Sequence, residues 1–218
     1  CSYVGTTADL AEAAQHFSAA CREENILYAE AILNPTHWPQ FSLPDIISAV
    51  TEGFDRGEAA GGADCRFTLS LSRNQTAEEA DALVSAMERC RTPRLAGLSI
   101  DGNEALSGRP GDRFAPAFAR ARELGFGLTA HAGESSGPEG VLDALECLKV
   151  DRIDHGVRAA EDPALLERLA KSEAHQGAEF ISIFYGEDVT EEQAQEAEKI
   201  FAAACPNAEV TLLPGGQP

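Results

Sequence analysis

Hydrophobic residues recur along the first 170 residues of the chain in two alternating patterns. In one pattern, apolar residues such as Leu10, Ala14 and Phe17 stand three or four positions apart, which predicts a helix over residues 8–24. In the other, a short apolar run such as ILYAEAIL at 26–33 predicts a strand. Further strands are predicted near residues 65, 95, 126 and 151, with helices near 42, 76, 114, 138 and 162 between and after them.

Several of the predicted helices begin at residues that favour a helix N-terminus. Pro44 suits the first turn of the helix that starts near Ser42. Thr76, followed three residues later by Glu79, fits a capping box. These start signals support the division into separate helices.

Strands that alternate with amphipathic helices indicate an α/β fold with β-α units around a parallel sheet. Such a rhythm suits either a (β/α) barrel or a doubly wound sheet. We expect the strands to be apolar on both faces, as buried parallel strands usually are.

The pattern changes after Lys171. A polar joint at 172–178 has no clear periodicity, and a strand, a helix and a strand follow in AEFISIFY, TEEQAQEAEKIFAAAC and AEVTLLP. Thr190 and Gln193 form a second capping-box pattern at the start of that helix. The sequence therefore predicts a larger unit over residues 1–172, and a joint with a small β-α-β tail unit over 173–218.

Composition and charge exclude several classes of partner. Hydrophobic residues make up 44% of the 218 residues and charged residues 24%, as in ordinary globular proteins. Seventeen basic against 36 acidic residues give a net charge of −19, which disfavours nucleic acid and anionic membrane surfaces as partners. No run of 18 apolar residues predicts a membrane span, and the first residues of the chain do not predict a secretory signal.

The six cysteines form no C-x-x-C pair, which argues against a zinc ribbon or a thioredoxin-type site. A chain of this length needs no disulfides, so we expect reduced thiols and a cytoplasmic protein. The terminal residues Cys1 and Pro218 do not resemble natural ends, so we expect the chain to be a fragment.

Two consecutive predicted strands end in histidines. His131 and Glu134 follow one apolar run, with Gly133 between them, and His155 and Gly156 end the next. Because neighbouring parallel strands lie about 4.8 Å apart, these side chains could converge on one small site. An imidazole can bind zinc or take a proton, and a partly buried carboxyl can give one.

A histidine at the end of a strand is more often a capping or core residue, but two successive strands with the same ending favour a function. One histidine is too few for a catalytic zinc, which takes three or more protein ligands. The remaining histidines, His16, His37 and His175, form no H-x-H pair.

The two histidine motifs, AHAGE at 130–134 and RIDHGVRA at 152–159, resemble the adenosine and adenine deaminase family. SIDGNE at 99–104, YAEAILNP at 28–35 and EDPALLERLAK at 161–171 extend the resemblance to about residues 8–172. It implies a partial TIM barrel of the metal-dependent hydrolase type. It also implies hydrolytic replacement of the 6-amino group of a purine.

The resemblance implies a role for four residues. His131 matches a zinc ligand, and Glu134 matches the acid that protonates the purine N1 as water adds at C6. His155 matches the base that orients and deprotonates that water. Gly102 matches the residue whose backbone N–H meets the purine N3. The implied cofactor is zinc, and the implied partner is a small purine.

The chain also departs from the family pattern. It lacks the H-x-H zinc ligands of the family's first barrel strand and the aspartate pair of the last, and it holds about five of eight β-α units. The P-C-x-x-C part of the cytidine-deaminase signature is absent as well. From about Gly177 the chain is instead similar to the C-terminal region of the dihydroxyacetone-kinase-like, fatty acid kinase large-subunit family, on YGEDV and the closing GGQP.

The sequence supports three functional hypotheses. The first is a purine deaminase, acting on adenosine or adenine, whose isolated chain is inactive. The second is a non-catalytic fragment that serves as a scaffold or binding surface. The third, which depends on the tail alone, is a regulatory module related to a fatty acid kinase subunit. The residues leave adenosine or adenine, and the oligomeric state, undecided.

Overall fold

The computed structural model describes residues 4–172, 177–187 and 189–216. The predicted joint lies mostly outside these residues, as do His175 and both chain ends. Five parallel strands form the main sheet in the spatial order β1-β2-β3-β4-β5. The strands are β1 (Tyr28–Leu33), β2 (Asp64–Ser72), β3 (Leu95–Asp101), β4 (Gly127–Ala132) and β5 (Arg152–His155). Because spatial order equals chain order, the sheet is that of a (β/α) barrel, whereas a doubly wound sheet reverses its order at a switch point.

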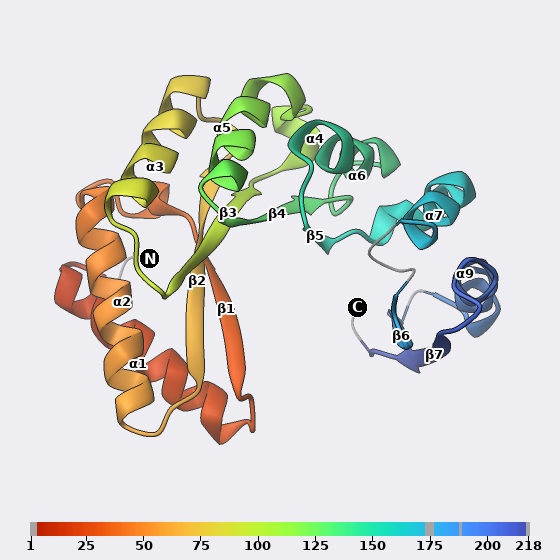
Figure 1. Ribbon diagram of the computed structural model, residues 1–218, viewed down its shortest axis with the longest axis horizontal. Helices are drawn as coiled ribbons and strands as arrows, with labels where there is room; N and C mark the ends of the chain where they lie inside the picture. Colours follow the sequence, from red (N-terminus) through yellow and green to blue (C-terminus); the bar gives the residue numbers. More distant parts are fainter. Residues whose placement is uncertain (1–3, 173–176, 188, 217–218) are drawn as a thin grey trace.

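Helices cover the convex face of the curled sheet (Figure 1). The long ones are α1 (Thr7–Glu23), α2 (Leu43–Ala59), α3 (Ala77–Arg89) and α5 (Gly111–Glu123). Shorter elements follow the strands: η1 (Pro35–His37), α4 (Glu104–Ser107), α6 (Pro138–Asp143), η2 (Ala144–Leu148), η3 (Val157–Glu161) and α7 (Pro163–Ala170). The partial TIM barrel that the sequence predicts is therefore the observed architecture of residues 4–172.

The predicted helix starts are present. Thr76 accepts a hydrogen bond from the Glu79 backbone N–H, and the Glu79 carboxylate accepts one from the Thr76 N–H, so the capping box is complete. Proline stands in the first turn of α2, α6 and α7. Within the described residues, no helix combines the length and the apolar character that crossing a membrane requires.

The two faces of the main sheet differ in chemistry. Phe67, Leu69 and Leu71 of β2 point toward the helices and are fully buried in the hydrophobic core. The alternate positions Thr68 and Ser70 are also buried but polar, and they lie on the concave face. The expectation that the strands are apolar on both faces is therefore wrong for the concave face, because small polar side chains line the inside of this partial barrel.

An ion pair joins the two ends of the main sheet across its concave face. Arg152 on β5 donates a hydrogen bond from Nη1 to Glu30 Oε2 on β1 over 2.9 Å. Glu30 also accepts one from the Tyr28 hydroxyl at 2.6 Å. Since β1 and β5 stand at opposite ends of the strand order, this contact shows how strongly the sheet curls.

The tail has a sheet of its own. β6 (Phe180–Tyr185) and β7 (Glu209–Pro214) pair in parallel, and α9 (Glu191–Ala204) connects them. The predicted capping box at Thr190 is present. The thiol of Cys205 donates to the Ala170 carbonyl at the end of α7. The described strands of the two sheets do not pair with one another, and the predicted boundary between residues 172 and 173 stays a prediction.

Candidate active site

The two histidine motifs lie side by side at the carboxyl edge of the main sheet. In the β4–β5 pairing, His131 stands opposite Asp154, and Ala132 opposite His155. Both strands are parallel, so both histidines emerge at the edge where barrel enzymes carry their sites. The structure thus brings together three of the four residues that the sequence singled out.

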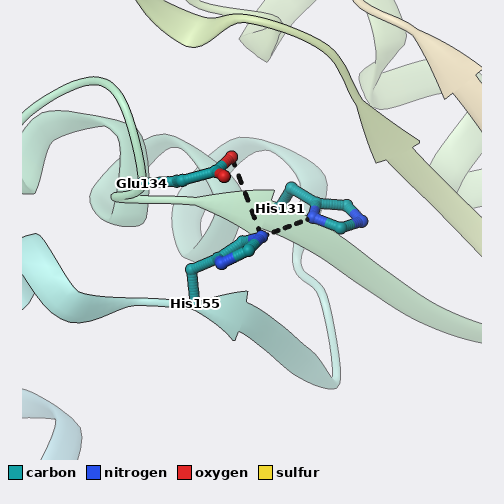
Figure 2. Close-up of side chains that lie close together, drawn as sticks. All are labelled: His131, Glu134 and His155. Carbon is teal, nitrogen blue, oxygen red and sulfur yellow. Dashed lines mark hydrogen bonds and ion pairs between the residues drawn. The ribbon is translucent and has the colours of Figure 1, made fainter. Parts of the chain in front are cut away.

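Those three side chains, His131, Glu134 and His155, point toward one another (Figure 2). His131 Nδ1 lies 2.8 Å from His155 Nε2, and the same Nε2 lies 3.7 Å from Glu134 Oε2. The side chain of Glu134 is 53% exposed and that of His155 is 37% exposed. A small molecule can therefore reach the cluster from solvent.

Backbone conformation turns His155 toward the cluster. Strict alternation along β5 would place His155 with Ile153 on the helix-covered face. Its φ of 73° is positive, a conformation that is costly for a residue other than glycine. Gly156 follows with φ 68°, and its N–H donates to the Ala132 carbonyl at 2.9 Å. Strain of this kind concentrates at functional sites, which favours a functional role for His155.

The turn that carries Glu134 depends on Gly133. Its φ is 66°, and a Cβ at this position would lie 2.6 Å from Val141 Cγ2 on α6. Both facts require glycine, because the turn after β4 must reverse tightly against α6. The turn at Gly133 thereby brings Glu134 to the same side of the sheet as His131.

A buried carboxylate, Glu104, holds the turn after β4. Its oxygens accept backbone N–H bonds from Gly133 at 3.1 Å, Glu134 at 2.9 Å, Ser135 at 3.1 Å and Ser136 at 3.3 Å. Burial opposes its ionisation, but the hydrogen bonds outweigh burial and hold the pKa of Glu104 below its usual value. Glu104 therefore faces the turn as a carboxylate at neutral pH.

Arg73, which follows β2, completes this buried layer. Its Nη2 donates to the backbone carbonyl of His131 and lies 3.6 Å from Glu104 Oε1. Burial lowers the pKa of Arg73, although Glu104 acts in the opposite direction. The sequence predicted no role for Arg73 or Glu104. The only signal was the place of Glu104 within SIDGNE.

Gly102, the fourth residue singled out, follows β3 at the same edge of the sheet. Its φ of 103° suits only glycine, and a Cβ there would meet Arg73 at 3.5 Å. Gly102 lies beside Arg73, whose backbone N–H donates to the Asp101 carbonyl at 3.0 Å, and it is not part of the cluster of His131, Glu134 and His155. Asp101, just before it, accepts a hydrogen bond from the Asn34 amide at 2.6 Å.

The donor set of the cluster suits a metal such as zinc. Two imidazoles and one carboxylate offer ligand atoms that lie within 4.8 Å of one another. Zinc–nitrogen bonds of about 2.0–2.1 Å imply ligand atoms about 3.3 Å apart in a tetrahedral site. Two of the three separations, 2.8 and 3.7 Å, bracket that value, and the third, between His131 and Glu134, is at most 4.8 Å, so the three side chains could close around an ion by moving together.

Two family models match parts of the chain. The family model for adenosine deaminase matches residues 2–179, and the model for the C-terminal region of FakA-like fatty acid kinase proteins matches residues 154–218. An adenine deaminase from Agrobacterium fabrum is 37% identical over 166 residues, which are 75% of this chain and 50% of that protein. One from Ralstonia pickettii is 36% identical over 76% of this chain and 49% of that protein. The chain thus spans about half the length of these curated relatives.

Solved structures agree on the fold. An amidohydrolase from Burkholderia ambifaria with bound zinc superposes with a TM-score of 0.69 at 28% identity, over 95% of this chain and 58% of that chain. An adenine deaminase from Arthrobacter aurescens gives a TM-score of 0.73 at 20% identity, over 97% of this chain and 65% of that chain. With a family model that matches most of its length, this chain belongs to the adenosine deaminase family.

Proposed function

We propose that this chain supplies acid–base and metal-binding residues of a zinc-dependent hydrolase that removes the 6-amino group of a purine. The observation that carries the proposal is the convergence of His131, Glu134 and His155 at the carboxyl edge of the sheet. The curated relatives from Agrobacterium fabrum and Ralstonia pickettii are adenine deaminases, which favours adenine as the substrate, with adenosine as the second candidate.

Each residue of the site has a proposed role. His131 would hold zinc, and Glu134 would donate a proton to the purine N1. His155 would take a proton from the attacking water, and the Gly102 N–H would bind the purine N3. When bound, zinc would lower the pKa of water so that a nucleophile is available near neutral pH.

The geometry supports a division of labour between Glu134 and His155. His155 Nε2 faces both His131 and Glu134 within 4 Å, so one nitrogen can take a proton from water beside the metal ligand. Glu134 stands on the other side of that nitrogen and can protonate the ring. Water would add at C6 as N1 gains a proton from Glu134 and His155 takes one from the water. His155 would then pass its proton to the amino group, which leaves as ammonia, and the C6 hydroxyl would lose its proton to Glu134 to leave a carbonyl.

The test uses a chimera, called the completed protein below. Segments of the Agrobacterium fabrum adenine deaminase from outside the matched region are added before the barrel part, and others replace the tail from residue 173. We expect this completed protein to release ammonia from adenine when zinc is supplied. Glu134→Gln in it should lower kcat by about 10²–10⁴-fold, the usual contribution of a general acid or base. Ammonia release measured by a coupled assay, with zinc content determined in parallel, gives both values.

Glu139→Gln is the matched control, because Glu139 stands in the first turn of α6 just after the β4 turn, is exposed, and accepts a backbone N–H only from Gly137 among the described residues. It should leave kcat unchanged. A folded, zinc-loaded protein that either lacks turnover or keeps full turnover after Glu134→Gln would overturn the proposal. The first of these outcomes would favour the non-catalytic scaffold.

A further inference from the structure

We infer that Glu104 and Arg73 form a buried positioning pair, which fixes the main chain on both sides of the β4 turn and so sets Glu134 against His131 and His155. Neither residue reaches the cluster with its own side chain. The inference depends on the proposed function only for its effect on catalysis, since the effect on the turn can be measured without activity.

The Glu104 carboxylate satisfies all the backbone donors of the turn. Glu104 Oε2 accepts the N–H groups of Glu134, Ser135 and Ser136, while Oε1 accepts the N–H of Gly133 and the hydroxyl of Ser136 at 3.0 Å. Every backbone N–H from Gly133 to Ser136 therefore donates a hydrogen bond to the same side chain. The hydrogen bond from Gly133 is buried and the other three are partly buried, so this carboxylate supplies partners that water reaches poorly.

The contact also runs in the opposite direction. The hydroxyl of Ser135 accepts a hydrogen bond from the Glu104 backbone N–H at 3.1 Å. The loop after β3 and the turn after β4 are therefore joined reciprocally, although about 30 residues separate them in sequence. A movement of Glu104 would carry Glu134 with it.

Arg73 acts on the other side of the turn. Its guanidinium donates to the His131 carbonyl and pairs with Glu104, and both side chains are only 2–3% exposed. A buried ion pair gives weak evidence for stability, because desolvation offsets most of the attraction. Its role here is geometric: one pair holds the backbone of His131 and that of Glu134 at once.

The hydrogen bonds at residue 104 require a carboxylate. Both oxygens of Glu104 accept at least two donors. A glutamine at the same place would turn one oxygen into an NH₂ group, which has no acceptor capacity. That NH₂ would face two donors, and those donors would lose their partner in a partly buried turn. Glu104→Gln therefore keeps the size and shape of the side chain but removes its negative charge and one of its two acceptor oxygens.

The primary experiment is amide hydrogen exchange, followed by NMR, on the 218-residue chain. Glu104→Gln should reduce protection of the Gly133, Glu134, Ser135 and Ser136 amides by about tenfold or more, the equivalent of about 1.4 kcal/mol. Glu139→Gln is again the matched control and should leave these four amides unchanged. Unaltered protection in Glu104→Gln would overturn the inference.

A milder variant guards against loss of folding. Ser136→Ala removes the side-chain hydroxyl that donates to Glu104 and leaves the backbone donors in place. It should lower protection of the Gly133 and Ser136 amides by about threefold, a fraction of one hydrogen bond. No change in either variant would contradict the positioning role.

In the completed protein, Glu104→Gln should lower kcat by about tenfold or more and change KM by less than about threefold, because Glu104 does not contact the proposed substrate. Glu104→Asp, which keeps the carboxylate, should recover part of kcat. A rise in KM with unchanged kcat would contradict positioning. If the completed protein shows no turnover at all, the proposed function fails, while the exchange data still decide the role of Glu104.

Discussion

At the scale of single residues, the concave face of the sheet depends on the absence of a side chain at Gly97. A Cβ at Gly97 would lie 2.2 Å from the Gly127 carbonyl oxygen, a backbone atom of the next strand that cannot move without breaking the sheet. Gly97→Ala should lower the free energy of unfolding by about 2–3 kcal/mol, as overpacking usually does. Urea denaturation measures the change.

Gly127 provides the control for this prediction. A Cβ there would meet its nearest neighbour, the Ala96 carbonyl oxygen, at an ordinary 3.5 Å. Gly127→Ala should change the free energy of unfolding by less than about 1 kcal/mol. Equal losses for both substitutions would mean that the close approach at Gly97 is not what selects glycine.

Sequence reasoning found the residues of the cluster but not those that support it. His131, Glu134 and His155 could be found because each follows an apolar run, and parallel strands bring such ends together. Glu104 and Arg73 carry no comparable local signal. Their role arises from backbone N–H and C=O groups about 30 and 60 residues away in sequence, which only the folded chain brings near.

At the scale of elements, the capping box of α3 should contribute measurably to stability. Thr76→Ala removes the acceptor for the Glu79 N–H. We expect a loss of about 1 kcal/mol in the free energy of unfolding. Thr76→Ser keeps the hydroxyl and should lose much less. A comparison of the two variants by urea denaturation separates the cap from the loss of a methyl group.

The Glu30–Arg152 pair, which joins β1 to β5, should make stability depend on pH. The hydrogen bond from Tyr28 lowers the pKa of Glu30, burial opposes it, and Arg152 lowers the pKa further. A lowered pKa means that the stabilisation is complete above the unfolded value of about 4.3 and is lost as pH falls below it. Glu30→Gln should therefore destabilise the protein at pH 7 by about 1–2 kcal/mol and progressively less below pH 4.

Urea denaturation of the wild type and of Glu30→Gln between pH 3 and pH 7 checks this sign. Glu12→Gln is the control, because Glu12 is exposed and its oxygen Oε1 lies a full 4.0 Å from His16 Nε2, a separation at which an exposed pair contributes little to stability. A difference between wild type and Glu30→Gln that stays constant down to pH 3 would show that the ionised carboxylate is not what joins the two strands.

The order of the strands was harder to predict than the strands themselves. A hydrophobic period of 3.6 residues identified the helices, and short continuous apolar runs identified the strands. The N-cap residues Thr76 and Thr190 gave the exact start of two helices. The choice between a barrel-type and a doubly wound sheet depends on which strands pair, and local periodicity is the same in both. The expectation that both faces of the strands are apolar failed for a related reason. Which strand positions face the inside of the curled sheet depends on how the strands pair and curve.

At the scale of the whole molecule, α7 stands where the two family matches overlap. The deaminase match ends at residue 179 and the fatty acid kinase-like match begins at residue 154, so both include α7. Leu165 of α7 belongs to the main hydrophobic core, whereas the Ala170 carbonyl accepts the Cys205 thiol of the tail. We propose that the tail from residue 173 is a separate unit attached to the barrel part through α7 (Figure 1).

We expect the proposed catalysis by the 218-residue chain alone to be limited by the number of available metal ligands. Catalytic zinc takes three protein ligands, and the sequence has no H-x-H pair to add to His131. His155 and Glu134 could complete the set, because their ligand atoms lie within 4.8 Å of His131. In that case the proposed base and acid would both be bound to the ion and neither could transfer a proton.

Whether zinc is held by His131 alone or by all three side chains, we expect that the chain does not turn over adenine or adenosine at an enzymatic rate. The purified chain with added zinc should release ammonia at well below about 1 s⁻¹, the low end of ordinary enzymes. Calorimetric titration with zinc distinguishes the two arrangements: if His131 alone holds the ion, binding is weak and only His131→Ala abolishes it. If all three side chains bind, Glu134→Gln weakens binding as well. Turnover at or above about 1 s⁻¹ would show that this chain contains a ligand set other than the one centred on His131.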